Sequence, residues 1–306
     1  MAGLTGAALV AAALAAPAVA TTPARTAEQA RPVFTDNVAH DTSRPLSDLA
    51  RAPRSLDAGS ARLPEERGAP GASTLAQRSA IDPVAQTSEV AAATVGAPVA
   101  NFEGLSNQDN FNIFGGRVNP PDPVGDVGPN HYVEMVNLTY AVYSKTGTRL
   151  LGPVDTGTLW QGFAVPDCTD PSGDPIVLYD QLADRWILSQ FTTRGLDDPS
   201  LPFYNCIAVS TTGDPTGSYY RYAFTTGANF PDYPKYGVWT DSYVITTREF
   251  GPTVEYGIGV YGLEKNKMLN GQPARAVSFY LDSNVVPLNL IGDGLLPADI
   301  DGKQKP

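Results

Sequence analysis

The chain has 306 residues, of which 32 are acidic and 21 are lysine or arginine, giving a formal net charge of −11. The sequence contains no basic cluster, and this argues against nucleic acid as a partner, because phosphate binding needs clustered lysine and arginine. The charged fraction is only 17%, while the chain contains 29 Gly, 27 Pro and 14 Tyr. Such a composition suits many short strands joined by tight turns better than long helices. We therefore expect an all-β protein.

Residues 1–20 have the features of a signal peptide. An apolar run over residues 4–19 is rich in Ala and Leu and ends at Ala18-Val19-Ala20, which supplies the small residues that a signal-peptide cleavage site requires. The run is too short for a comfortable membrane span. No Lys or Arg precedes it, and a buried Ala-rich helix is the alternative interpretation. We expect a secreted, extracellular protein whose mature chain has no transmembrane span.

Residues 21–97 differ in composition from the rest of the chain. They are rich in Ala, Thr, Ser, Pro, Arg and Glu, show no sustained hydrophobic period and nearly lack aromatic residues apart from Phe34. A stretch of this kind buries too little apolar surface to offset the entropy of ordering it. We expect a disordered spacer or propeptide that is extended and makes few contacts with the rest of the protein.

Short segments with alternating apolar residues begin near Val99 and are bounded by Gly, Pro, Asp or Asn, as in a run of β-strands. Residues 98–306 are therefore expected to form the folded part of the chain. A hairpin turn is expected at Lys145–Thr148 and one short helical turn at Glu264–Leu269. The clearest strands are predicted at His131–Val136, Thr139–Ser144, Ile176–Tyr179, Arg185–Phe191, Asn205–Ser210, Tyr219–Phe224, Tyr243–Thr247 and Tyr256–Gly262.

A unit recurs in this region at intervals of roughly 50 to 60 residues. Each copy has an Asp beside a Pro, a few strand residues, a polar turn, and then an aromatic residue that opens a second strand. The copies begin at Asp122, Asp174 and Asp232, and a fourth begins within Leu296–Gly302. Repeats of this kind are typical of β-propeller blades, in which each four-stranded sheet buries its faces against its neighbours. Coincidence among Asp- and Pro-rich turns of a β-sandwich is the alternative.

Four segments of this region resemble a family of large secreted bacterial proteins, mostly uncharacterised, with sialidase-like (BNR-type) β-propellers. They are GDVGPNHYVEMVN (125–137), GDPIVLYDQLADRWILSQF (173–191), CIAVSTTGDPTGSYYRYAF (206–224) and DYPKYGVW (232–239). The resemblance covers roughly residues 100–302 and implies a propeller fold, but it implies no particular reaction. It also implies that relatives continue into further blades after Asp301-Gly302, so that this chain is truncated.

The expected architecture is an incomplete β-propeller of about three to four blades over residues 98–306, arranged as an open arc. Val99–Leu105 is interpreted as a clasp strand of the kind that completes the last sheet of a propeller. Because fewer blades are present than a closed ring requires, one apolar face of the terminal blade is expected to stay uncovered and to favour association.

Cys168 and Cys206 are the only cysteines, and in an oxidising compartment we expect them to form a disulfide. Two free buried thiols are the alternative. A zinc site would need a better ligand set than these cysteines and the two distant histidines, His40 and His131, provide. A cysteine nucleophile would need a base beside it, and neither histidine has a motif context for that role.

The aspartates of the repeat are candidates for a site at one end of the propeller channel. Asp122, Asp174 and Asp232 are expected to form a ring of carboxylates, with Asp126 and Asp180 nearby. In one interpretation each Asp caps a turn through its own backbone. In a second, Asp122, Asp126, Asp174 and Asp180 bind Ca²⁺, the one cofactor that the pattern suggests. In a third, a carboxyl pair acts as acid and base in glycoside hydrolysis.

A sialidase-like reaction would also need arginines that bind a substrate carboxylate. Arg185 and Arg221 are the best-placed candidates, although pairing with Asp180 or Asp184 explains Arg185 better. The Ser-Xaa-Asp-Xaa-Gly-Xaa-Thr-Trp box of true sialidase repeats is absent from the sequence. Its absence counts against a sialidase.

Two functions remain in competition. The first is a secreted binding or scaffold module for extracellular glycans or proteins, in which Tyr219, Tyr220 and Trp239 are candidates for stacking on a sugar. Aromatic residues of propellers mostly pack between blades, however. The second is a glycan-active hydrolase that uses the channel carboxylates. Because an incomplete ring leaves a central site incomplete, we expect the binding module rather than the enzyme.

Overall fold

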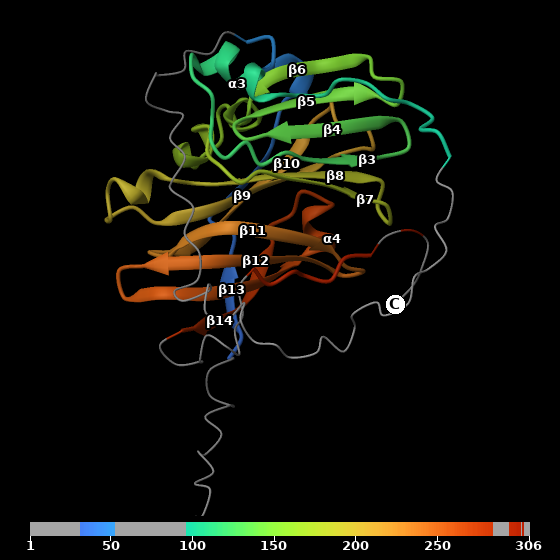
Figure 1. Cartoon of the computed structure of the whole chain (residues 1–306). Helices are drawn as coiled ribbons and strands as arrows, with labels where there is room; N and C mark the ends of the chain where they lie inside the picture. The colour runs from blue at the N-terminus through green and yellow to red at the C-terminus, as the bar shows by residue number, and fades with distance from the viewer. Residues whose placement is uncertain (1–30, 53–95, 284–293, 301, 303–306) are drawn as a thin grey trace, which may run out of the picture.

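The structure, a computed structural model, describes residues 31–52, 96–283, 294–300 and 302. In these residues fourteen strands form three antiparallel sheets that are stacked one upon the next (Figure 1). The predicted all-β fold is confirmed. None of the three sheets closes on itself within the described part of the chain. The predicted signal peptide lies outside that part.

The first sheet is a simple meander with strand order β3-β4-β5-β6. Its strands are β3 (Val124–Val127), β4 (His131–Val136), β5 (Thr139–Ser144) and β6 (Arg149–Asp155). Gly147 lies in the turn between β5 and β6 and has a φ of 87°, a left-handed conformation that glycine adopts without steric cost. The hairpin turn predicted there is confirmed.

The second and third sheets repeat this meander and each gain an outer strand from the N-terminal part of the chain. Their strand orders are β2-β10-β9-β8-β7 and β1-β14-β13-β12-β11. Their strands after residue 96 are β7 (Ile176–Asp180), β8 (Arg185–Phe191), β9 (Phe203–Ser210), β10 (Tyr219–Gly227), β11 (Phe230–Val238), β12 (Ser242–Gly251), β13 (Val254–Glu264) and β14 (Arg275–Asp282).

The strands that open the three sheets lie next to one another. β3 contacts β7, and β7 contacts β11. After the third sheet, Ile300 donates its main-chain N–H to the carbonyl oxygen of Val238 in β11, and Val238 donates to Asp299 Oδ1. The start of the fourth repeat therefore lies beside the first strand of the third sheet. Adjacent first strands are a feature of packed propeller blades, and the propeller assignment itself remains a prediction.

Both faces of the middle sheet are buried, and this explains the apolar run of β8. Trp186 and Leu188 pack in a cluster with residues of the first sheet such as Met135. Ile187, between them, packs in a cluster with residues of the third sheet such as Tyr243. Side chains of a strand alternate between its two faces, so each face of the middle sheet contributes to a separate core.

Residues 31–52, which we call the N-terminal strap, form two further strands. This corrects the expectation of a spacer with few contacts. β1 (Val33–Asp36) pairs with β14, and β2 (Ala39–Thr42) pairs with β10, so the strap adds an edge strand to two different sheets. The rest of the expected spacer, residues 53–95, lies outside the described residues.

Specific contacts fix the strap in place. Arg221 of β10 is buried and donates from Nε and Nη2 to the two carboxylate oxygens of Asp41, at 2.8 and 2.6 Å. Leu46 and Leu49, in the one-turn helix α1 (Leu46–Leu49), pack into the core between the first two sheets. The average composition of residues 21–97 concealed these few anchoring side chains. Arg221 is therefore a structural residue rather than a ligand for a substrate carboxylate.

The segment expected to form a clasp strand, Val99–Leu105, is not a strand. It crosses the outer face of the first sheet and leads into α3 (Asn107–Phe114). The Ser106 hydroxyl accepts from the main-chain N–H of Gln108, and the Asp109 carboxylate accepts from the main-chain N–H of Ser106. Such reciprocal capping starts a helix that was not predicted from the sequence.

The remaining helices are short. α4 (Lys265–Met268) occurs where one helical turn was predicted, and η1 (Thr156–Trp160), η2 (Pro166–Thr169) and η3 (Arg194–Leu196) are 3₁₀ turns in the loops. No helix of the described ranges is long and apolar enough to cross a membrane.

Candidate functional site

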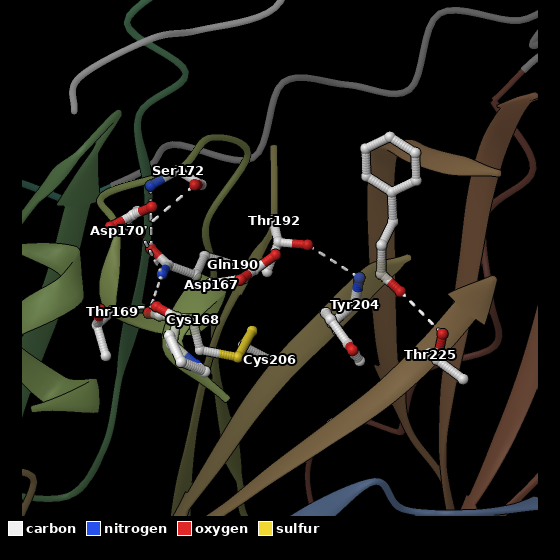
Figure 2. Close-up of a disulfide and its surroundings, with 12 residues drawn as sticks. Asp167, Cys168, Thr169, Asp170, Ser172, Gln190, Thr192, Tyr204, Cys206 and Thr225 are labelled. Carbon is white, nitrogen blue, oxygen red and sulfur yellow. Dashed lines mark hydrogen bonds between the residues drawn. A yellow bond between two sulfur atoms is a disulfide. The ribbon is translucent and has the colours of Figure 1, made fainter. Parts of the chain in front are cut away.

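Cys168 and Cys206 form a disulfide, as predicted (Figure 2). Cys168 lies in η2 and Cys206 in β9, with their Cα atoms 5.9 Å apart and both side chains fully buried. The bridge links the loop before β7 to β9, which is in the same sheet as β7.

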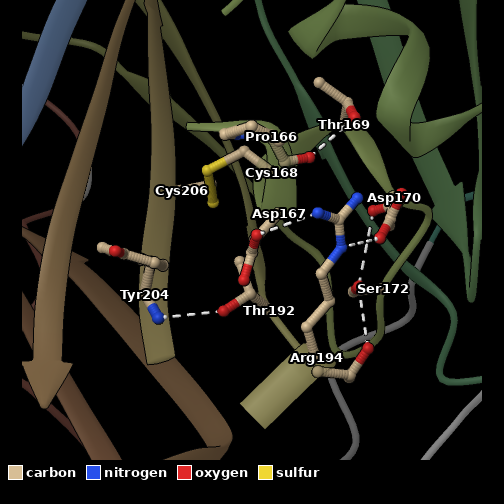
Figure 3. A network of polar contacts seen from close by, with 11 residues as sticks. Pro166, Asp167, Cys168, Thr169, Asp170, Ser172, Thr192, Arg194, Tyr204 and Cys206 are labelled. Atoms are coloured by element: carbon tan, nitrogen blue, oxygen red, sulfur yellow. Dashed lines mark hydrogen bonds and ion pairs between the residues drawn. A yellow bond between two sulfur atoms is a disulfide. The ribbon is translucent and has the colours of Figure 1, made fainter. Parts of the chain in front are cut away.

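Hydrogen bonds hold the rest of this loop. Gln190 of β8 donates from Nε2 to the carbonyl oxygens of Cys168 and Asp170, at 2.7 and 2.9 Å (Figure 2). Arg194 donates to the carboxylates of Asp167 and Asp170, at 3.2 and 2.6 Å (Figure 3). The loop leads directly into β7, so these contacts fix the entry to the second sheet.

In each sheet a residue with a positive φ precedes a proline, two residues before the first strand in the first two sheets and within β11 in the third. These residues are Asp122, Asp174 and Tyr233, with φ of 34°, 41° and 49°. A positive φ is uncommon outside glycine and persists only where the surrounding structure imposes it. The first two copies of the repeat are therefore equivalent in structure. In the third copy Tyr233, and not Asp232, occupies the equivalent position.

A chain of hydrogen bonds joins the three sheets at these entry residues. Asn137, between β4 and β5, donates from Nδ2 to Asp122 Oδ2 at 2.8 Å, and its Oδ1 accepts the main-chain N–H of Asp174 at 3.1 Å. Asp174 Oδ2 in turn accepts the main-chain N–H of Tyr233 at 3.2 Å. The first, second and third sheets are thus connected near the starts of β3 and β7 and at the pairing irregularity within β11.

The structure brings the three predicted aspartates of the repeat together. Burial, together with the negative charges of Asp232 and Asp122, raises the pKa of Asp174 to about 7. Asp232 is buried, whereas Asp122 and Asp174 are partly exposed. Lys235 is also close by, and its positive charge opposes the rise. Burial lowers the pKa of Lys235 itself.

Two cations lie against the ring of Tyr233. Lys235 Nζ is 3.4 Å from the ring centroid, and the guanidinium carbon of Arg248 is 4.0 Å from it. Cations are attracted to the negative face of an aromatic ring. The site therefore combines three carboxylates, two cations and the amide of Asn137. We call these residues, with Tyr233, the entry cluster.

The raised pKa of Asp174 predicts a pH dependence of stability. The folded state binds the Asp174 proton more tightly than the unfolded state does, so protonation favours folding. This contribution is complete below the ordinary pKa of 3.8 and is lost as the pH rises towards about 7. We expect denaturant titrations at pH 4 to 8 to show a fall in the free energy of unfolding over that window. In Asp174→Asn the free energy of unfolding should depend less on pH over this window. The control Asp241→Asn, in an exposed turn, should keep the wild-type pH dependence. An unchanged pH dependence in Asp174→Asn would show that Asp174 is not the group responsible.

Asp126 and Asp180 do not belong to the entry cluster. Asp126 Oδ2 accepts the main-chain N–H of Tyr179 at 2.7 Å, which ties β3 to β7. Asp180 is at the far end of β7, where its Oδ1 accepts the main-chain N–H groups of Leu182 and Ala183. For Asp180 the turn-capping interpretation is the right one. The expectation that it lies near the other carboxylates was wrong, because β7 separates it from Asp174.

The residues proposed for Ca²⁺ are not arranged as a ligand set. Among the described residues, no three side chains of His, Cys, Asp or Glu converge in a metal-binding group. The oxygens of Asp126 and Asp180 are used by main-chain N–H groups, and Asp180 lies at the other end of β7 from Asp174. The donor set does not fit the ion.

Arg185 is also remote from the entry cluster. It follows the turn at the far end of β7 and donates from Nη1 to the carbonyl oxygens of Ala183 and Asp184, at 3.2 and 2.8 Å. It therefore contributes to the turn and not to a substrate site. Sequence reasoning selected Arg185 and missed Arg248, because Arg248 lies within β12 and belongs to no recognisable motif.

The aromatic residues considered for sugar stacking are mainly structural. Tyr219 is fully buried, and its hydroxyl donates to the carbonyl oxygen of Pro215 at 2.7 Å. Tyr220 and Trp239 are partly exposed, but they belong to different sheets and neither borders the entry cluster in any contact that we observe. The packing interpretation is correct for Tyr219.

Comparison with known proteins assigns no family. No protein-family model matches the chain, and neither a search of curated proteins nor one of solved structures finds a match. The resemblance to sialidase-like propellers therefore depends on the four sequence segments and the repeat alone.

Proposed function

We propose that the protein is an exported binding module whose sheets are propeller blades and whose entry cluster binds a polar ligand, foremost a glycan. The observation that supports this most directly is the hydrogen-bonded chain from Asp122 through Asn137 and Asp174 to Tyr233. It connects three sheets at corresponding positions of three successive repeats. Ligand sites of repeat architectures are built from equivalent positions of successive repeats in this way.

The chemistry of the cluster suits a ligand with many hydroxyl groups. Asp122 and Asp174 are partly exposed and supply hydrogen-bond acceptors, while Lys235 supplies a donor. A sugar hydroxyl both donates and accepts, so it can satisfy groups of both kinds at once. Cations and carboxylates are present together, so the local charge gives no advantage to a strongly anionic or a strongly cationic ligand.

Binding should depend on the Asp174 side chain. We expect Asp174→Asn to weaken glycan binding by about 10- to 100-fold at pH 8, where the Asp174 carboxyl is mainly ionised, because a hydrogen bond to a charged group contributes about 1.5–3 kcal/mol. The measurement is a glycan array to find the ligand, followed by titration calorimetry with the strongest hit. Asp241→Asn, in an exposed turn, is the matched control and should bind normally. Equal affinities of the two variants would rule out the entry cluster as the binding site.

Glycoside hydrolysis is the second candidate, and one observation favours it. A carboxylic acid with a pKa of about 7 is available to donate a proton at neutral pH, which is the property of a catalytic general acid. Asp122 or Asp232 would then be the second carboxylate of the pair. Turnover in a screen of glycosides, abolished by Asp174→Asn, would identify an enzyme. Binding without turnover would identify a binding module.

A further inference from the structure

A cavity of about 660 Å³ lies on the outer face of the first sheet, away from the entry cluster. One wall is the segment that crosses this face before α3, and the other walls are β4, the end of β3 and the turn after β5. Its lining includes Val99, Phe102, Val127, Tyr132, Glu134 and Lys145.

The crossing segment is held against the sheet by a carboxylate and by aromatic rings. The main-chain N–H of Leu105 donates to Glu134 Oε2 at 2.7 Å. The ring of Phe102 lies 6.0 Å from that of Tyr132 and 5.6 Å from that of Tyr143, measured between centroids. A side chain at Gly104 would collide with the Glu134 carboxylate. The cavity is therefore formed by specific contacts between this segment and the first sheet.

The charges around Glu134 favour a cationic ligand. Burial raises the pKa of Glu134, the hydrogen bonds from Leu105 and Tyr132 oppose the rise, and the nearby negative charge of Asp109 adds to it. The described residues form no ion pair with the Glu134 carboxylate that would offset its charge. The Tyr132 hydroxyl hydrogen-bonds to the same carboxylate. Lys145 lies in the lining, but its Nζ donates to the carbonyl oxygen of Gly128 at 3.0 Å. An incoming cation would meet a carboxylate beside aromatic rings, which is the composition of sites that bind ammonium groups.

We propose that this cavity binds a primary alkylammonium group, as carried by a lysine side chain, with its charge on Glu134 and its methylene chain against Phe102 and Tyr132. A neutral sugar would satisfy the carboxylate less well, because it brings no charge to offset that of Glu134 and Asp109. The proposal is independent of the entry cluster, whose residues do not line the cavity.

The test compares a lysine derivative with an uncharged analogue that has the same four side-chain carbons but no amine. Nα-acetyl-lysine methylamide, with a free side-chain amine, and Nα-acetyl-norleucine methylamide are titrated into the full chain, and binding is followed by NMR or by tyrosine fluorescence. We expect the lysine derivative to bind at least about tenfold more tightly, a difference that an ion pair beside an aromatic ring readily provides. Pentylamine serves as a third probe. If it binds as tightly as the lysine derivative, the alkylammonium group alone accounts for binding, as proposed.

Two variants connect the binding to the cavity. Glu134→Gln keeps an oxygen acceptor for the Leu105 N–H but removes the charge, and it should lower the affinity about tenfold; Glu103→Gln, on the exposed side of the same segment, should not. If circular dichroism shows that Glu134→Gln does not fold, Tyr132→Leu provides a second variant. It should also weaken binding. Equal binding of the lysine and norleucine derivatives, no saturable binding of the lysine derivative, or full affinity in a folded Glu134→Gln variant would overturn the proposal.

Discussion

Replacing both Cys168 and Cys206 with alanine is expected to lower the free energy of unfolding by about 3–4 kcal/mol. The two cysteines are 38 residues apart in the sequence, and a bridge across a loop of this size restricts the unfolded chain substantially. Both side chains are fully buried, so the loss of their packing adds to the effect. Guanidinium denaturation of both proteins measures the difference.

Reduction of the wild-type protein provides the control for this measurement. A reductant should destabilise the wild type by a similar amount and leave the double variant unchanged. The effect should also reach the entry cluster, because the bridged loop leads into Asp174. Hydrogen exchange of the loop residues should therefore accelerate in the double variant. An unchanged denaturation midpoint on reduction would show that the bridge contributes no stability.

The strands that were predicted from the sequence share one physical property. Every strand predicted between His131 and Gly262 is present, and each carries alternating or continuous apolar residues along a sheet that is buried on one or both faces. β11 (Phe230–Val238) was predicted only in part, as the strand residues that follow Pro234 in the third repeat, because Pro231 and Pro234 lack the N–H that a ladder requires. The structure accommodates Pro234 with an irregularity in the pairing between Asp232 and Lys235.

The strap and α3 were missed for a different reason. β1 and β2 pair with strands that come more than 170 residues later in the chain. Next to β2, for example, the Ser43 hydroxyl accepts a hydrogen bond from the main-chain N–H of Tyr219, 176 residues away. Such pairing leaves no signal within a local window. α3 did have a local signal, since Ser106 and Asp109 form a capping box. Its asparagine-rich sequence has low helix propensity and concealed that signal.

The entry cluster was predicted in part. The Asp-Pro pattern located Asp122 and Asp174, because the positive φ before a proline recurs with the repeat. It misplaced the third position by one residue, since Tyr233 and not Asp232 precedes the proline. Lys235 and Arg248 could be assigned only from the structure, because their approach to Tyr233 depends on the pairing of β11 with β12.

A second large effect is expected where the second sheet meets the third. Asp180 of β7 is fully buried, and its Oδ2 lies 2.7 Å from Nζ of Lys265, whose side chain is 3% exposed. The Tyr243 hydroxyl donates to the same carboxylate oxygen at 3.0 Å, and Lys265 also donates to the carbonyl oxygen of Trp239 at 2.9 Å. The ion pair and its hydrogen bonds therefore connect β7, β12 and α4 inside the protein.

Lys265→Met should lower the free energy of unfolding by about 3–5 kcal/mol, because it leaves a buried carboxylate without its cation. Arg275→Met is the matched control, since Arg275 and Glu264 form an exposed ion pair that should contribute about 0–1 kcal/mol. Adding Asp180→Asn to Lys265→Met removes the uncompensated charge and keeps an oxygen for the turn N–H groups. The double variant should therefore be more stable than Lys265→Met alone. A double variant whose destabilisation equals the sum of the two single effects would show that the pair is not coupled, and that the interface between the sheets depends on apolar packing alone.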